Sequence, residues 1–157
     1  MGYTTNFHGS FELDRPVDDA TYALLHGLAT TRRMKRKLGP EYGVDGEFYV
    51  DSKEDFGQTH TPDIVNFNCP PSTQPGLWCH WLISSDRMSI EWDGGEKFYD
   101  YVEWLKYIID NILHPRGYVL NGQVSWQGED AEDMGIIRVD SNGVRVGLAK
   151  ISFEFDV

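Results

Sequence analysis

Five of the chain's 14 Lys and Arg residues lie within the six positions from Arg32 to Lys37. Arg offers a planar fork to phosphate oxygens, and Lys offers a point charge. On a helix, Arg32, Arg33 and Arg36 would partly share one face, because residues three and four apart are neighbours. The cluster therefore predicts a site for an anion. A solvated helix end, stabilised by the helix dipole, is the other interpretation of the same residues.

Aromatic side chains make up 13% of the chain and could stack on a planar ligand. With Trp78, Trp92 or Tyr49 near the arginines, both the phosphate and the base of a nucleotide would be met. Trp92 also has the parity of a core residue. Glu129 could accept a hydrogen bond from a ribose hydroxyl or a base amine. The candidate ligand-binding residues are Arg32, Arg33, Arg36, Tyr49, Trp78, His80, Trp92, Trp126, Gln127 and Glu129.

Other chemistries have weaker support in the sequence. Cys79 has the parity of a buried strand residue, where a thiol is inert, and Cys69 lies in a loop before two prolines. The chain has neither a His-Glu-x-x-His motif nor paired Cys-x-x-Cys motifs, and the acidic stretch 129–133 lacks the spacing of a calcium loop. We therefore predict no catalytic residue, no metal and no cofactor. An enzyme that cleaves a nucleotide or glycosidic bond, with Glu129 or His80 as acid or base, is the alternative.

Composition limits the partners. The formal net charge of −11 and a pI of about 4.7 would repel phosphate backbones, which argues against bulk nucleic-acid binding. No apolar run approaches the roughly 20 residues of a membrane span, and the N-terminus lacks a signal-peptide pattern. Two cysteines are too few for a disulfide framework. These features predict a cytoplasmic protein whose acidic surface could instead serve to bind a basic partner.

Hydrophobic periodicity predicts a single α+β domain over residues 1–157. Alternation predicts strands and hairpins, and a repeat of three and four predicts helices. The second helix ends before Gly117, and an Asn142-Gly143 turn suits the last hairpin. The expected elements are a strand over 3–13, a helix from Asp14 to Lys37 with Asp14 as its cap, a strand over 46–50, a hairpin over 77–92, a helix over 98–112, a strand over 118–126 and a hairpin over 136–151.

These elements predict one antiparallel sheet of about six strands, with both amphipathic helices packed on one face. The opposite face would show Trp78, His80, Glu91, Gln123 and Ser125. A long irregular loop at about 51–76 is expected to be functional, because loops of this length are uncommon inside compact domains.

Several stretches resemble a family of small phage and bacterial proteins that has no established activity. The resemblance covers most of the chain, and the segment Pro70–Cys79 is its most distinctive part. It rests on residues 1–7, 32–36, 41–44, 70–81, 92–99 and 121–130. It implies a phage or mobile-element setting, in which small proteins often act against host defence.

The expected function is therefore binding of a small anionic ligand, such as a nucleotide-derived signal of a bacterial host. A phage counter-defence protein would sequester such a signal. The alternatives are the nucleotide- or glycoside-cleaving enzyme and an acidic protein-interaction module or inhibitor of a host protein. The sequence leaves the oligomeric state and the ligand's identity open.

Overall fold

Alternating apolar and polar residues in the first strand define two faces of a sheet. In the computed structural model, which describes residues 2–37, 55–58 and 63–156, Phe7, Phe11 and Leu13 of β1 (Asn6–Leu13) are buried and the residues between them are mostly exposed. β1 pairs antiparallel with β6 (Leu120–Gln127) over its whole length, with Phe11 opposite Gly122. This central pair, with one buried face, carries the rest of the fold.

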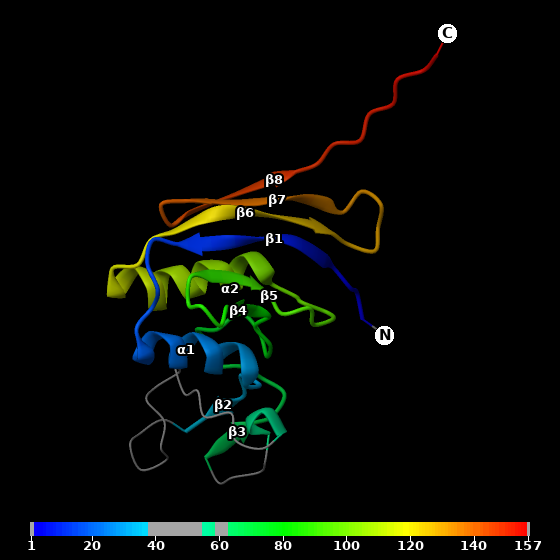
Figure 1. The fold of residues 1–157 in the computed structure, drawn as a ribbon. Helices are drawn as coiled ribbons and strands as arrows, with labels where there is room; N and C mark the ends of the chain where they lie inside the picture. Colours follow the sequence, from blue (N-terminus) through cyan, green and yellow to red (C-terminus); the bar gives the residue numbers. More distant parts are fainter. Residues whose placement is uncertain (1, 38–54, 59–62, 157) are drawn as a thin grey trace.

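The main sheet has six antiparallel strands in the order β4-β5-β1-β6-β7-β8, and a small sheet pairs β2 with β3. The predicted α+β fold with a six-stranded antiparallel sheet and two helices is confirmed (Figure 1). The predicted strand over 46–50 lies outside the described residues. The remaining elements are α1 (Asp19–Thr30), β2 (Lys35–Arg36), a 3₁₀ turn (Asp55–Gly57), β3 (Ile64–Asn66), β4 (Trp81–Ile83), β5 (Ser89–Trp92), α2 (Tyr101–Ile108), β7 (Met134–Asp140) and β8 (Gly143–Leu148).

Helix α2 fills the buried face of the sheet. It continues without a break into a π-helical turn, Ile109–Leu113, and a 3₁₀ turn, His114–Arg116, and ends at Gly117 in a left-handed conformation. Its side chains form one core with those of the central strands. The fully buried side chains of that core include Trp81, Phe98, Trp104, Leu105, Ile112, Leu120 and Ile137.

The prediction for the first helix is wrong at both ends. Asp18, not Asp14, caps α1, and its carboxylate accepts a hydrogen bond from the backbone N–H of Thr21 at 2.8 Å. Asp14 instead accepts from the backbone N–H of Val119 at 3.0 Å, and so fixes the end of β1 beside the start of β6. Asp14 therefore joins two strands instead of capping the helix, and the local sequence pattern does not indicate such a long-range contact.

At its other end, α1 stops at Thr30 rather than at Lys37. Thr31 has extended dihedral angles, φ −122° and ψ 133°, and two successive β-branched residues favour this exit from the helix. Beyond it the backbone N–H groups of Arg33 and Lys35 donate to the carbonyls of Leu77 and Cys69, at 2.7 and 2.8 Å. The basic cluster is therefore an extended segment containing β2, not the last turns of a helix.

The last hairpin turns one residue earlier than predicted. Asp140 is paired with Gly143, so Ser141 and Asn142 are the two central residues of the turn, and both have positive φ, 47° and 69°. That conformation is the one a type I′ turn requires. The Asn142 side chain explains the shift, because its Oδ1 accepts from the Leu120 N–H at 2.7 Å and its amide donates to the Tyr118 carbonyl at 3.0 Å.

We predict that Gly122→Ala lowers the free energy of unfolding by about 1–3 kcal/mol. Gly122 has a φ of +138°, and a Cβ there would lie 2.8 Å from the carbonyl oxygen of Ser10 and 2.9 Å from the Cα of Phe11. Gly147→Ala is the matched control, because the nearest atom to its added Cβ is 4.0 Å away. Urea denaturation measures both. Equal stability of the two variants would contradict the close approach of β1 and β6.

Candidate functional site

A cavity of about 670 Å³ lies between the end of α1 and the segments that flank the β4–β5 hairpin. This volume is within the roughly 300–1,000 Å³ of small-molecule sites. We call it the Trp78 pocket. Its lining residues are Ala29, Arg32, Phe56, Gly76, Leu77, Trp78, His80, Asp93, Glu96, Lys97, Tyr99 and Asp100.

Strand pairing brings these segments together. β4 and β5 are antiparallel neighbours, so the residues that enter β4 lie beside those that leave β5, and the Asp93 N–H donates to the His80 carbonyl at 3.0 Å. The bond from the Arg33 N–H to the Leu77 carbonyl holds the end of α1 against the same place. Three connections that are distant in the sequence thus share one cavity.

Arg32 is the arginine of the basic cluster that lines the pocket. Its Nε–H donates to the carbonyl of Phe67 at 3.0 Å, and its guanidinium carbon lies 5.8 Å from the ring centroid of Trp78. Within the described part of the chain, the two Nη groups of Arg32 make no hydrogen bond. Its position therefore leaves the forked end of the side chain for a ligand in contact with Trp78.

The other two predicted arginines contact the protein itself. The side chain of Arg33 is buried, and its Nε–H donates to Gln74, whose amide donates to the hydroxyl of Tyr107. Arg36 forms an ion pair with Asp63 at 2.8 Å and donates to a backbone carbonyl at 2.6 Å. Neither is among the residues that line the Trp78 pocket. Arg33 and Arg36 thus hold the segment around β2 in place, and Arg32 places its positive charge in the wall of the cavity.

His80 and Asp93 form an oriented pair in the wall of the pocket. The two carboxylate oxygens of Asp93 lie 2.9 and 3.0 Å from Nδ1 of His80, and one of them also accepts from the Gly95 N–H at 2.7 Å. A carboxylate only accepts hydrogen bonds, so Nδ1 of His80 carries the proton of this bond. Nε2 is then the ring nitrogen that Asp93 does not engage. Phe98 packs edge-on against the imidazole, with centroids 5.1 Å apart. Both rings are thus held in one orientation.

The charges of the pocket are mixed. Arg32 and Lys97 are its cations, and Asp93, Glu96 and Asp100 are its carboxylates. A site of this kind suits a ligand that carries a limited negative charge and also donates hydrogen bonds. It disfavours a highly charged polyanion, because the carboxylates would repel it.

Two further features mark this wall as unusual. Phe56, Lys97 and Asp100 all have positive φ, between 55° and 60°, a conformation that costs energy for residues other than glycine. The indole N–H of Trp104 is buried, without a hydrogen-bond partner among the described residues. A Cβ on Gly76 would lie 3.7 Å from it and 3.6 Å from a carboxylate oxygen of Asp100. Strained backbone clusters at functional sites, and an unpaired buried donor is one that a bound group could satisfy.

The remaining predicted residues lie elsewhere. Trp92 donates to the Gly95 carbonyl and packs on the core at Phe7. Trp126 donates to Asp133, and the Gln127 amide donates to backbone carbonyls of the acidic loop, so both build the 128–133 turn. Glu129 is exposed in that loop. None of these four lines the Trp78 pocket. Tyr49 lies outside the described residues.

Six side chains of the pocket were not predicted from the sequence: Phe56, Asp93, Glu96, Lys97, Tyr99 and Asp100. The available signal was the Asp93-Gly94-Gly95 turn with Glu96, which favours the start of a helix and could also bind an anion through its free backbone N–H groups. Helix α2 begins later, at Tyr101, which leaves residues 93–100 as an irregular connection beside the cavity. Phe56 gave no signal, because it is one aromatic residue in a long irregular stretch.

The acidic loop is mostly exposed, and hydrogen bonds also attach it to the N-terminal segment. The hydroxyl of Tyr3 donates to Asp133 at 2.6 Å, and this bond raises the pKa of Tyr3. The backbone N–H of Tyr3 donates to the hydroxyl of Tyr99, which lines the Trp78 pocket. The loop therefore supports one side of the pocket indirectly.

Three observations bound the chemistry of the described residues. No group of three or more His, Cys, Asp or Glu side chains among them could hold a metal ion. No helix formed by them has both the length and the apolar character needed to cross a membrane. The Cys79 thiol is fully buried in the core, and burial raises its pKa to about 12.

Comparison of the chain with models of protein families, with curated proteins and with solved structures found no match.

We predict that a thiol reagent modifies Cys69 but not Cys79 in the folded protein near pH 8. The reactive species is the thiolate. Cys79 is buried, and its pKa of about 12 keeps the thiol neutral at pH 8, whereas Cys69 is exposed. Mass spectrometry after alkylation should find one adduct on the native chain and two after unfolding. Cys69→Ser is the control, and native labelling of that variant would contradict the buried position of Cys79.

Proposed function

We propose that this protein binds a nucleotide-like molecule in the Trp78 pocket. The observation that carries the proposal is the meeting of Arg32, Trp78 and the His80–Asp93 pair at one cavity. These groups come from three separate segments. Together they offer a stacking surface, a phosphate-binding cation and hydrogen-bonding side chains.

The aromatic side of the pocket suits a planar base. Trp78 is half-buried, and Phe56 meets it edge-on with ring centroids 5.9 Å apart. Tyr99 is a third ring on the wall. Stacking of a base on such a side chain contributes about 1–3 kcal/mol and requires no particular base. The Arg32 guanidinium, which lies over the Trp78 ring, places a cation next to the stacked ligand.

The cations set the number of phosphates. Arg32 and Lys97 can neutralise one phosphate group, which carries up to two negative charges near pH 7. Asp93, Glu96 and Asp100 would oppose further phosphates, and the overall charge of −11 adds to that repulsion. The ligand class is therefore a nucleoside monophosphate or a cyclic nucleotide rather than a triphosphate.

The carboxylates supply the remaining recognition. Glu96 and Asp100 line the pocket and can accept hydrogen bonds from ribose hydroxyls or base amines. Binding without reaction would remove a nucleotide signal from the host's solution. That is the counter-defence role that the resemblance to phage proteins implies, and it is part of the proposal.

The His80–Asp93 pair favours a second candidate function. A carboxylate on Nδ1 orients an imidazole so that Nε2 can take a proton. In this version, Nε2 of His80 would accept a proton from a water molecule that attacks the bound ligand at phosphorus or at the glycosidic carbon. The P–O bond to the leaving alcohol, or the glycosidic bond to the base, would break, and the leaving group would take up a proton from solvent. The hydrogen-bonded pair at 2.9 Å is the observation that favours it.

We predict that Arg32→Ala and Trp78→Leu each weaken binding of a nucleoside monophosphate at least about tenfold, through loss of a charge-assisted hydrogen bond and of stacking. Isothermal titration calorimetry with mono-, di- and triphosphates of one nucleoside gives the affinities, and the monophosphate should bind most tightly. Lys106→Ala is the control, since Lys106 is exposed on α2 and does not line the pocket. Unchanged affinity of both pocket variants would remove the site.

We predict that the wild-type protein and His80→Gln release the same intact ligand on denaturation if binding is the function. A ligand that the wild type returns cleaved, and His80→Gln returns intact, would establish the second candidate instead. Chromatography of the mixture before and after denaturation distinguishes the two results. A variant that still binds shows that the pocket survives the substitution.

A further inference from the structure

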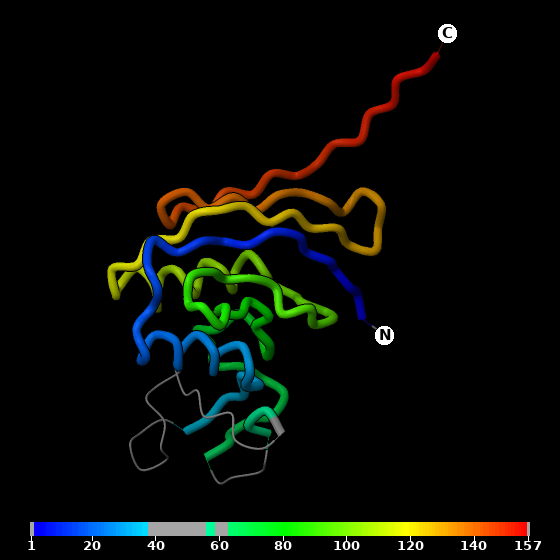
Figure 2. Tube along the Cα trace, in the orientation of Figure 1, coloured from blue at the N-terminus to red at the C-terminus, as the bar shows by residue number. Residues whose placement is uncertain are grey.

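The segment that follows β8 leaves the sheet in an extended conformation and projects from the rest of the molecule (Figure 2). Its residues alternate between apolar and polar side chains, as in a strand with two different faces. Ile151, Phe153 and Phe155 are 48%, 77% and 84% exposed. Three exposed large apolar residues in a row of alternate positions are unusual for a surface, and they indicate a missing neighbour.

Strand β8 has a free edge beside this segment. It ends the main sheet and pairs only with β7 among the described strands. The backbone N–H and C=O groups along its other edge are therefore available to a further strand, which is the feature that sheet edges must conceal. Val146 and Leu148 on β8 are also exposed, at 46% and 77%.

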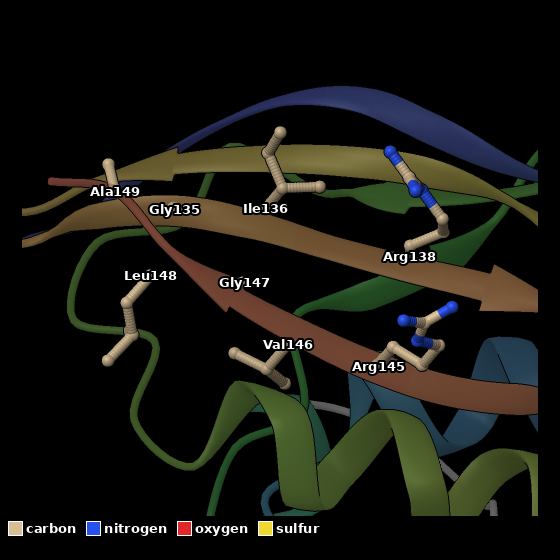
Figure 3. A pocket seen from close by; sticks show the side chains of 8 residues that line it. All are labelled: Gly135, Ile136, Arg138, Arg145, Val146, Gly147, Leu148 and Ala149. Carbon is tan, nitrogen blue, oxygen red and sulfur yellow. The ribbon is translucent and has the colours of Figure 1, made fainter.

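A groove of about 280 Å³ runs along β7 and β8 at this edge, and we call it the β8 groove (Figure 3). Arg138 and Arg145 lie directly opposite each other across the two strands. Like charges in that position destabilise a strand pair. Arg138 is held by Gln123, and Arg145 has no hydrogen-bond or ion-pair partner among the described residues. The groove is lined by Gly135, Ile136, Arg138, Arg145, Val146, Gly147, Leu148 and Ala149.

The segment and the groove are complementary. The polar positions of the segment are Lys150, Ser152, Glu154 and Asp156, so its far end is acidic, and the polar positions of the groove are the two arginines. In a chain of net charge −11, a pair of unopposed arginines is a local exception that an acidic strand would satisfy. The apolar residues also match in kind, because the groove offers aliphatic side chains and glycines, and the segment offers Ile and Phe.

We propose that two copies of this chain associate by exchanging residues 149–156. The segment of each copy adds as a strand to the free β8 edge of the other. Glu154 and Asp156 then meet Arg138 and Arg145, and the three exposed apolar residues are covered. Backbone hydrogen bonds along the edge give affinity, and the alternating side chains give specificity. The exchange is reciprocal, as a twofold interface requires.

Charge reversal on both sides of the contact tests this exchange. Arg145→Glu alone places like charges on both halves of the dimer, and so does Glu154→Arg alone. An equimolar mixture of the two variants restores opposite charges at both contacts. We expect each variant alone to dimerise at least about tenfold more weakly than the wild type, and the mixture to regain most of the wild-type affinity. Sedimentation across a concentration series measures the dissociation constants.

Two further outcomes bear directly on the proposal. Phe153→Ser with Phe155→Ser should make the protein monomeric while its circular dichroism and thermal unfolding remain those of the wild-type monomer, because both side chains are mostly exposed in the single chain. A wild-type chain that stays monomeric at every concentration would overturn the second copy as the occupant. A dimer that neither reversal weakens would overturn the β8 edge as its interface.

Discussion

The packing of α2 against the inner face of β1 and β6 is the interaction on which the rest of the structure depends. The two strands pair along their whole length, and their inward side chains form one buried core with those of the helix. The chain must therefore turn back from the end of β5 to the buried face of the sheet before α2 begins. Residues 93–100 make that connection, with positive φ at Lys97 and Asp100. The strained wall of the Trp78 pocket is thus a consequence of how the core is closed.

This dependence explains which parts of the structure the sequence could predict. β6 alternates cleanly because one face meets the core and the other meets solvent, and the burial of Leu120, Val124 and Trp126 follows that pattern. α2 is predictable for the same reason, since its apolar residues recur at the helical period and are buried in the core. Where a segment depends on contacts distant in the sequence, the prediction is wrong. The basic cluster follows an apolar helical repeat, but its backbone pairs with Leu77 and Cys69.

The same division applies to the pocket. Arg32, Trp78 and His80 were identified from residue type and charge, and the structure brings these three together. Arg33 and Arg36 have the same residue type, but extended backbone directs them to Gln74 and Asp63, which no local pattern reports. Asp93 and Lys97 were not predicted, because the Gly94-Gly95 turn favours the start of a helix rather than an irregular connection over 93–100. Residue chemistry can suggest a site, but backbone pairing decides which of the suggested side chains reach it.

Charge connects the two proposals. The chain has a net charge of −11, and within its described part arginine lines both the Trp78 pocket, through Arg32, and the β8 groove, through Arg145. Arg32 lies in the extended segment after α1 and Arg145 lies in β8, and the two arginines differ in their surroundings. The first combines a cation with aromatic rings and carboxylates, which suits a small planar ligand. The second lies along an open strand edge, which suits an extended acidic segment.

The five tryptophan indole N–H groups provide the most direct test of the central claim, that the Trp78 pocket binds a nucleotide. Each gives one signal in a ¹⁵N–¹H spectrum, and Trp→Phe variants assign them. Titration with a nucleoside monophosphate should move the signals of Trp78 and of Trp104, whose N–H is buried without a partner beside the pocket, and leave that of Trp126, bonded to Asp133, in place. A spectrum in which Trp78 does not respond, or in which Trp126 responds instead, would contradict the account.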